Sequence, residues 1–197
     1  MKTKILSLVI LTLSPLFANA DGLLTYKPPK IDALQSSHVG GGTRSLGDQR
    51  IQLLAPSGVA LSNSAQPVLY WNAALDKGQS IEVIVIEEGA GEPLLEKTIS
   101  VSPSSGLKAL RLADYGVSLQ AGKKYLWSIS TVTGSDSTVA QATIVYQPSS
   151  TLSSLEQKAE LGYWYDALQQ SIENHSPQAS LLVKQIGVTT NIDFSKI

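Results

Sequence analysis

The chain of 197 residues contains no cysteine, only two histidines, and no hydrophobic run long enough to span a bilayer. Without cysteine it can form no disulfide, no cysteine-ligated metal site and no lipid-modified N-terminal cysteine. Its charges also lack an excess of one sign, because 15 Lys and Arg face 16 Asp and Glu for a formal net charge of −1. Since neither a basic patch nor an acidic run occurs, nothing favours nucleic acid or an anionic membrane as a partner.

The first 20 residues have the pattern of a secretory signal peptide. Lys2 and Lys4 give a positive start, residues 5–17 are mostly apolar, and residues 18–20 read Ala-Asn-Ala, a small-x-small cleavage pattern. The apolar stretch is too short to cross a bilayer, and a short membrane anchor is the alternative interpretation. We therefore expect export to the periplasm or the extracellular space, with no integral membrane span after cleavage.

Residues 21–47 are predicted to be a flexible linker. Pro28 and Pro29 favour an extended backbone, because proline fixes φ and has no N–H to donate. The three consecutive glycines at 40–42 add backbone freedom. The segment has no apolar periodicity long enough to build a core element.

Residues 48–147 are predicted to form a β-sandwich domain. The segments have the alternation and length of short strands and are separated by turn residues. The expected strands are residues 49–55, 68–71, 81–86, 94–101, 107–112, 124–133 and 138–146. About seven short strands in this length are typical of an immunoglobulin-like or fibronectin-III-like sandwich. A barrel of unrelated topology is the alternative, because strand number does not fix topology.

The spacing of residues 119–127 predicts a tyrosine corner. Leu119, Gly122 and Tyr125 have the spacing at which a tyrosine near the start of a late strand returns its hydroxyl to the upstream backbone. Trp127 follows two residues later on the same face, and Trp71 lies on an early strand. We expect Trp71, Tyr125 and Trp127 to be structural anchors of the core.

Residues 151–187 change to a helical period, and residues 188–197 are left as a tail. Ser153 and Glu156 fit a capping box, and Trp164, Leu168 and Ile172 continue an apolar stripe at helical spacing. A further helix is expected to start at Ser176-Pro177 and to end at Gly187. The prediction is a small helical hairpin, with up to three helices, that packs on the sandwich.

Several motifs together resemble a bacterial family called domain of unknown function 928. They are Gly40-Gly41-Gly42-Thr43-Arg44, Tyr125-x-Trp127, Gly162-x-Trp164-Tyr165-Asp166-Ala167-Leu168 and Leu181-Leu182-x-x-x-Ile186-Gly187. The resemblance covers about residues 40–188. Members of that family often carry cysteines, and this chain has none. The resemblance implies domain boundaries and a type of fold, but no activity.

Residues that could carry chemistry are few. His38 lies in the predicted linker and His175 at a predicted helix end, where neither is held as a catalytic base requires. No spacing indicates a zinc or calcium site. Five glutamates surround one predicted hairpin: Glu82, Glu87, Glu88, Glu92 and Glu96. A charged, exposed strand edge explains these glutamates better than the pair of catalytic carboxylates of a glycosidase. No catalytic, metal or cofactor residue is therefore predicted.

The best candidate for an interaction surface is the run Tyr163, Trp164 and Tyr165. Consecutive helical residues point about 100° apart, so one packed face is not expected to bury all three. The alternative is that they only seal the junction between helix and sheet. The sequence favours a non-enzymatic interaction or structural module that meets another exported or envelope protein. A binder of a small saccharide or lipid, held between sandwich and helices, is the alternative, and a hydrolase is the least favoured.

Overall fold

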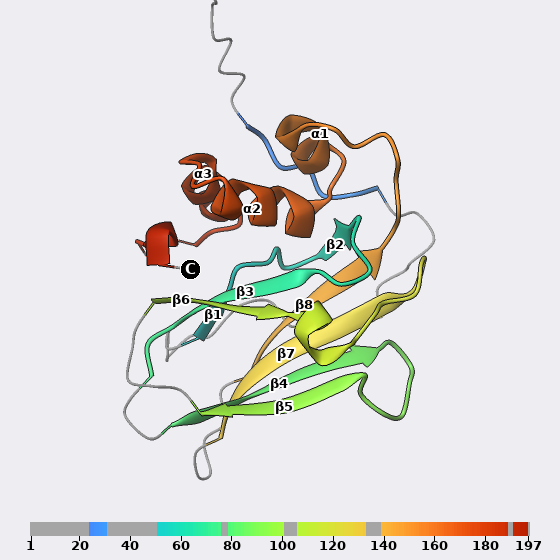
Figure 1. Ribbon diagram of the computed structural model, residues 1–197, viewed down its shortest axis with the longest axis vertical. Helices are drawn as coiled ribbons and strands as arrows, with labels where there is room; N and C mark the ends of the chain where they lie inside the picture. The colour runs from blue at the N-terminus through green and yellow to red at the C-terminus, as the bar shows by residue number, and fades with distance from the viewer. Residues whose placement is uncertain are drawn as a thin grey trace, which may run out of the picture.

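The computed structural model describes residues 24–30, 51–75, 79–100, 106–132, 139–188 and 191–196. The predicted signal peptide, the glycine run at 40–42 and His38 lie outside these residues. Figure 1 shows a mostly β protein with a group of short helices at one end. Every helix in the described ranges is too short or too polar to cross a membrane.

The strands form two sheets. The three-stranded sheet has the order β1-β3-β6, and the five-stranded sheet has the order β2-β8-β7-β4-β5. The strands are β1 (Ile51–Leu53), β2 (Val59–Ser62), β3 (Val68–Ala73), β4 (Ser80–Glu87), β5 (Leu95–Ser100), β6 (Gly106–Arg111), β7 (Lys124–Val132) and β8 (Val139–Tyr146). A 3-10 turn, η1 (Leu112–Tyr115), follows β6. One hydrophobic cluster holds side chains of both sheets, so the sheets share a core.

Strand β2 was not predicted from the sequence. It pairs in parallel with β8, with Val59 opposite Thr143, whereas the other pairings are antiparallel. The chain leaves the three-stranded sheet after β1 and joins the five-stranded sheet at β2.

The late strand β7 supplies the largest buried side chains of the five-stranded sheet. The Tyr125 hydroxyl accepts a hydrogen bond from the Gln120 backbone N–H at 3.0 Å, which is the tyrosine corner that the spacing predicts. Tyr125 and Trp127 are buried on β7, and Trp71 is buried on β3 of the other sheet. The three predicted anchors therefore lie in the core.

Three short helices follow the strands: α1 (Leu155–Glu160), α2 (Trp164–Glu173) and α3 (Gln178–Gln185). They lie on the side of β2 and β3 that faces away from β4 and β5 (Figure 1). The capping box at the start of α1 uses Ser154 and Gln157, one residue later than the predicted Ser153 and Glu156. Two Ser-x-x-Glu/Gln patterns overlap here, and Leu155 and Ala159 of the helix are buried.

Residues 24–30 do not form part of a flexible linker, so the prediction for 21–47 is wrong there. This segment, which we call the N-terminal strap, runs extended along the helices, with Leu24 and Tyr26 only 4% and 9% exposed. The Lys27 N–H donates to the Ala159 carbonyl at 3.0 Å. Gln185 accepts from the Tyr26 N–H and donates to the Leu24 carbonyl, both at 2.8 Å. Apolar side chains and backbone partners thus fix a segment that proline keeps extended.

The predicted tail also packs in part. Val188 and Ile192 are buried, and Phe194 packs against the core from a second 3-10 turn, η2 (Phe194–Lys196).

Candidate functional site

The predicted interaction surface is buried, so that prediction is wrong. Tyr163, Trp164 and Tyr165 are only 6%, 0% and 3% exposed. Their side chains do diverge around α2, but each direction meets a different neighbour. The three aromatics therefore belong to the protein's interior and are not available to a partner.

Trp164 and Tyr165 are buried where the chain crosses between the sheets. The Trp164 indole N–H donates to the Leu54 carbonyl at 2.8 Å, in the crossing that follows β1. The Tyr26 ring of the strap packs edge-on against Trp164, with ring centroids 4.8 Å apart. The Tyr165 hydroxyl accepts from the Trp127 indole N–H at 2.8 Å. Burial raises the pKa of Tyr165 far above its ordinary value, so the phenol stays protonated and its role is structural.

Tyr163 covers the free edge of the five-stranded sheet. It packs with Leu61 and Val145 in a second hydrophobic cluster. The Leu61 N–H of β2 donates to the Gly162 carbonyl at 2.9 Å, so the turn before α2 takes a hydrogen bond from this edge strand. Gly162 has φ +84°, and a Cβ there would lie 2.7 Å from the Pro29 Cδ of the strap. The position therefore requires glycine for both its conformation and its space.

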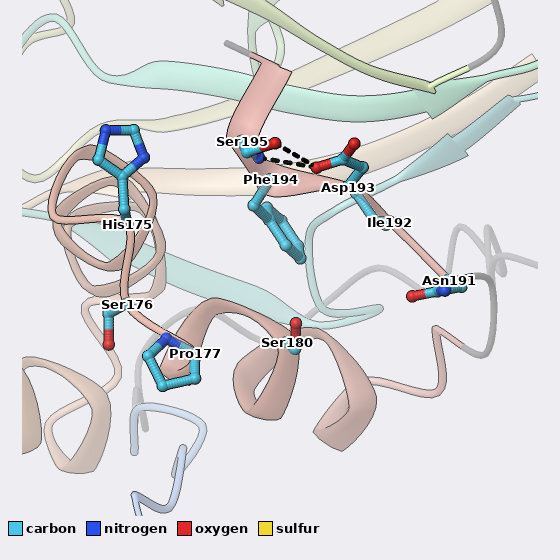
Figure 2. Close-up of a pocket in the computed structure, with 9 residues that line it drawn as sticks. All are labelled: His175, Ser176, Pro177, Ser180, Asn191, Ile192, Asp193, Phe194 and Ser195. Atoms are coloured by element: carbon cyan, nitrogen blue, oxygen red, sulfur yellow. Dashed lines mark hydrogen bonds between the residues drawn. The ribbon is translucent and has the colours of Figure 1, made fainter.

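Figure 2 shows the residues that line a cavity between the α2–α3 turn and the C-terminal residues. The cavity has a volume of about 580 Å³, and its lining includes His175, Asp193 and Ser195, the residue types of a hydrolytic triad. The Ser195 hydroxyl, however, donates directly to Asp193 at 2.6 Å, and the Ser195 backbone N–H also donates to Asp193 at 3.1 Å. In a triad the histidine stands between serine and aspartate. These contacts instead describe a local turn, and His175 belongs to the turn between two helices.

A second cavity, which we call the α2 cleft, lies between the sheet side and α2 and has a volume of about 340 Å³. Its polar lining includes Arg111, Lys158, Asp166, Gln170, Glu173 and Asn174. Asp166, Gln169, Gln170 and Glu173 are spaced as i, i+3, i+4 and i+7, so they form one stripe along α2. Trp164, Leu168 and Ile172 form the buried stripe of the same helix. One amphipathic helix thus fixes the core with one face and lines a cleft with the other.

Hydrogen bonds hold the cleft walls in place. The Arg111 guanidinium at the end of β6 contacts the Glu173 carboxylate of α2 at 3.4 Å. Gln169 donates to the same carboxylate oxygen, Oε1, at 2.9 Å. Lys158 donates to the Gln170 side-chain carbonyl at 2.8 Å, joining α1 to α2. The exposed Arg111–Glu173 pair contributes about 0–1 kcal/mol to stability, so a ligand could compete with it at little cost.

Asp166 ties the inner end of the cleft to the sheet. Its Oδ2 accepts from the Asn63 backbone N–H at 2.7 Å, and the Asn63 side chain accepts from the Ser149 N–H at 2.6 Å. Burial raises the pKa of Asp166, while the Asn63 N–H and the positive charge of Lys158 lower it. The network therefore holds a partly desolvated carboxylate next to the cleft.

A buried phenol lies close to the same charges. Tyr70 on β3 is buried, and its hydroxyl has no hydrogen-bond partner within the described ranges. Burial and the negative charge of Glu173 raise its pKa to about 12, and the positive charge of Arg111 lowers it. Sequence reasoning found none of this arrangement, because Arg111 and Glu173 come from elements far apart in the chain.

The glutamates of the β4–β5 hairpin do not enter either cavity. Glu87 pairs with Lys123, and Glu88 pairs with Lys124 at 2.9 Å. Glu88, Glu92 and Glu96 are exposed, and β5 forms an edge of its sheet. In the part of the chain that the structure describes, no three acidic or histidine side chains gather as metal ligands would.

The protein is thus a mostly β chain with two sheets, covered at one end by short helices and an N-terminal strap. The chain belongs to the family Domain of Unknown Function (DUF928), whose model matches residues 39–187, as the resemblance predicted. No curated protein matches the chain.

Some solved structures resemble about half of the chain. The sulfur carrier protein SoxY from Chlorobium limicola f thiosulfatophilum is 14% identical, with 51% of this chain and 81% of that chain covered and a TM-score of 0.33. The Salmonella enterica SafA pilin in complex with the SafB chaperone is 12% identical over 55% of this chain and 59% of that chain, with a TM-score of 0.37. The periplasmic chaperone SfaE is 14% identical over 54% of this chain and 62% of that chain, with a TM-score of 0.33. TM-scores of this size carry no argument about fold or function.

Proposed function

We propose that this protein is an exported, non-enzymatic binding module that holds a small polar ligand in the α2 cleft. The observation that carries the proposal is that the polar stripe of α2 lines, together with Arg111, a cavity of about 340 Å³. This volume lies at the lower end of the range of ligand sites, about 300–1,000 Å³. The cleft walls come from α1, α2 and the sheet side, which the Asp166–Asn63 and Trp164–Leu54 hydrogen bonds hold together.

We further propose that the two sheets form an immunoglobulin-like sandwich. The sheet orders β1-β3-β6 and β2-β8-β7-β4-β5 support this class, because an early strand pairs in parallel with the last strand at one edge. The tyrosine corner at Tyr125 supports it as well. In such a fold the sandwich serves as a rigid scaffold, and function depends on what is attached to it.

Export is proposed from the signal-like pattern of the first 20 residues. A protein partner in the envelope was the first expectation, but it depended on an exposed Tyr163–Tyr165 run, and that run is buried. A lipid is also disfavoured, because a lipid site needs an apolar lining and the α2 cleft is mostly polar. A small polar ligand of the same compartment is therefore the better supported target.

Nuclear magnetic resonance of the chain from residue 21 onward tests the proposal. Small molecules extracted from the envelope of the producing cells are added, and backbone amide shifts are followed. We expect shifts at Arg111 and along Gln169–Asn174, and none at Thr98 on the exposed β5 edge. Shifts confined to other regions, or none at all, would refute the site. Chemical conversion of the bound compound during long incubation would refute the non-enzymatic role.

A further inference from the structure

The charges of the α2 cleft are balanced. Arg111 and Lys158 supply two positive groups, and Asp166 and Glu173 supply two negative groups. Arg111 already contacts Glu173, and the charge of Lys158 acts on Asp166. A ligand with a net charge would be attracted by one pair member and repelled by the other. The cleft therefore fits a ligand with no net charge.

The hydrogen bonds within the cleft leave a mixed set of donors and acceptors for a ligand. Glu173 uses Oε1 for Arg111 and Gln169, which leaves its Oε2 as an acceptor. Gln169 donates through Nε2 and keeps its side-chain carbonyl, while Gln170 accepts through Oε1 and keeps its NH₂ group. Asn174 adds an exposed amide. Carboxylates, amides and guanidinium groups are planar and present donors or acceptors in pairs.

This mixture of donors and acceptors matches hydroxyl groups, which can both donate and accept. Each hydroxyl donates one hydrogen bond and accepts up to two, so a hydroxyl beside an amide or carboxylate can satisfy both neighbours. Neighbouring hydroxyls on a ring can engage both atoms of one planar side chain. Val68 and Ala113 are the apolar residues in the lining, and no aromatic side chain lines the cleft.

We propose that the α2 cleft binds a small neutral saccharide, an inference that rests on the proposed binding function. Glu173 Oε2 and the Gln169 carbonyl accept from ligand hydroxyls, and the Gln170 amide and the Arg111 guanidinium donate to them. Asp166 is a positioning residue, because it holds α2 against the Asn63 backbone.

Titration with a panel of neutral mono- and disaccharides tests this inference on the chain from residue 21 onward. Calorimetry measures the affinity, and amide shifts locate the binding. For the saccharide that binds best, Glu173→Gln should weaken binding about tenfold, because a charged acceptor becomes a neutral amide. The matched control is Glu96→Gln on the exposed β5 edge, which should leave the affinity unchanged. Circular dichroism and thermal unfolding establish that both variants are folded.

Salt separates a neutral ligand from a charged one. Screening weakens charge attraction, so the affinity for a neutral saccharide should change less than about twofold between low and high salt. Binding of amino acids or phosphates in the cleft, with no saccharide bound, would overturn this inference and leave the proposed binding function intact. Saccharide binding away from the cleft, or equal effects of Glu173→Gln and Glu96→Gln, would overturn it as well. No ligand of any class in the cleft would overturn both proposals.

Discussion

The Trp127–Tyr165 hydrogen bond gives the sharpest test of how the helices are attached. It joins the five-stranded sheet to α2 at 2.8 Å, and both residues are buried. Tyr165→Phe removes only the accepting hydroxyl and keeps the ring. The Trp127 indole N–H is then left buried without a partner, which costs about 1–3 kcal/mol of the free energy of unfolding.

This loss is measurable by urea unfolding and by thermal unfolding. For a chain of this size each kcal/mol lowers Tm by about 2–4 °C, so Tyr165→Phe should lower Tm by about 2–12 °C. Tyr115→Phe is the matched control, because Tyr115 on η1 is 41% exposed. An exposed substitution of this kind should change stability by less than about 0.5 kcal/mol. If Tyr165→Phe is as mild as Tyr115→Phe, the argument that α2 is fastened through this bond fails.

Two further substitutions test the strap and the buried carboxylate. Gly162→Ala places a Cβ 2.7 Å from Pro29 at φ +84°, so it should cost about 1–2 kcal/mol for the left-handed backbone and more for the displaced strap. In a chain that begins at residue 31 and lacks the strap, Gly162→Ala should cost only the free energy of the left-handed backbone. If urea unfolding shows the same loss of stability with and without the strap, the proposed clash with Pro29 is refuted. Burial raises the pKa of Asp166 in the folded protein above 3.8, its value in the unfolded chain. Between these two pKa values the folded protein binds more protons than the unfolded chain, so stability falls as the pH rises. Asp166→Asn keeps an oxygen that can accept from the Asn63 N–H but carries no charge. At neutral pH this variant should be more stable than the parent protein, and the difference should shrink below pH 3.8. Equal urea midpoints of the two proteins at neutral pH would refute this.

Local rules predicted the elements whose signals are local. The tyrosine corner followed from three residues within seven positions, and strand β4 followed from the alternation that buries Ile81, Val83 and Val85. Family membership followed from motifs that are specific in combination. These features require no knowledge of which segments meet in space.

The misses at β2, at the aromatic run and at the strap share one cause, which is contact between segments far apart in the chain. Val59–Ser62 is only four residues long and follows a Pro-Ser-Gly turn, and its partner β8 lies far along the chain. The burial of Tyr163, Trp164 and Tyr165 depends on β2, on the crossing after β1 and on the strap. Helical geometry gives the directions of these side chains, but not what lies in each direction. Leu24 and Tyr26, apolar at alternate positions, were the one signal that the proline-rich segment would pack.

The α2 cleft could not be predicted for the same reason, but the two faces of α2 could. Its two stripes are readable in the sequence: Trp164, Leu168 and Ile172 on one side, and Asp166, Gln169, Gln170 and Glu173 on the other. What the sequence does not reveal is that β6 ends in Arg111 opposite Glu173.

The division of α2 into two faces makes stability and binding separable. Substitutions on the buried stripe act on the core, where removing large apolar side chains costs several kcal/mol. Substitutions of Gln169, Gln170 and Glu173 on the polar stripe act on partly or fully exposed groups, where an ion pair contributes about 0–1 kcal/mol. Asp166 differs from them, because its carboxylate is partly desolvated and holds α2 to the Asn63 backbone. Arg111 contacts Glu173, and Asp166 is fixed to the Asn63 backbone, so both contacts place polar groups of α2 in a defined geometry. The ligand recognition that we propose needs such a geometry.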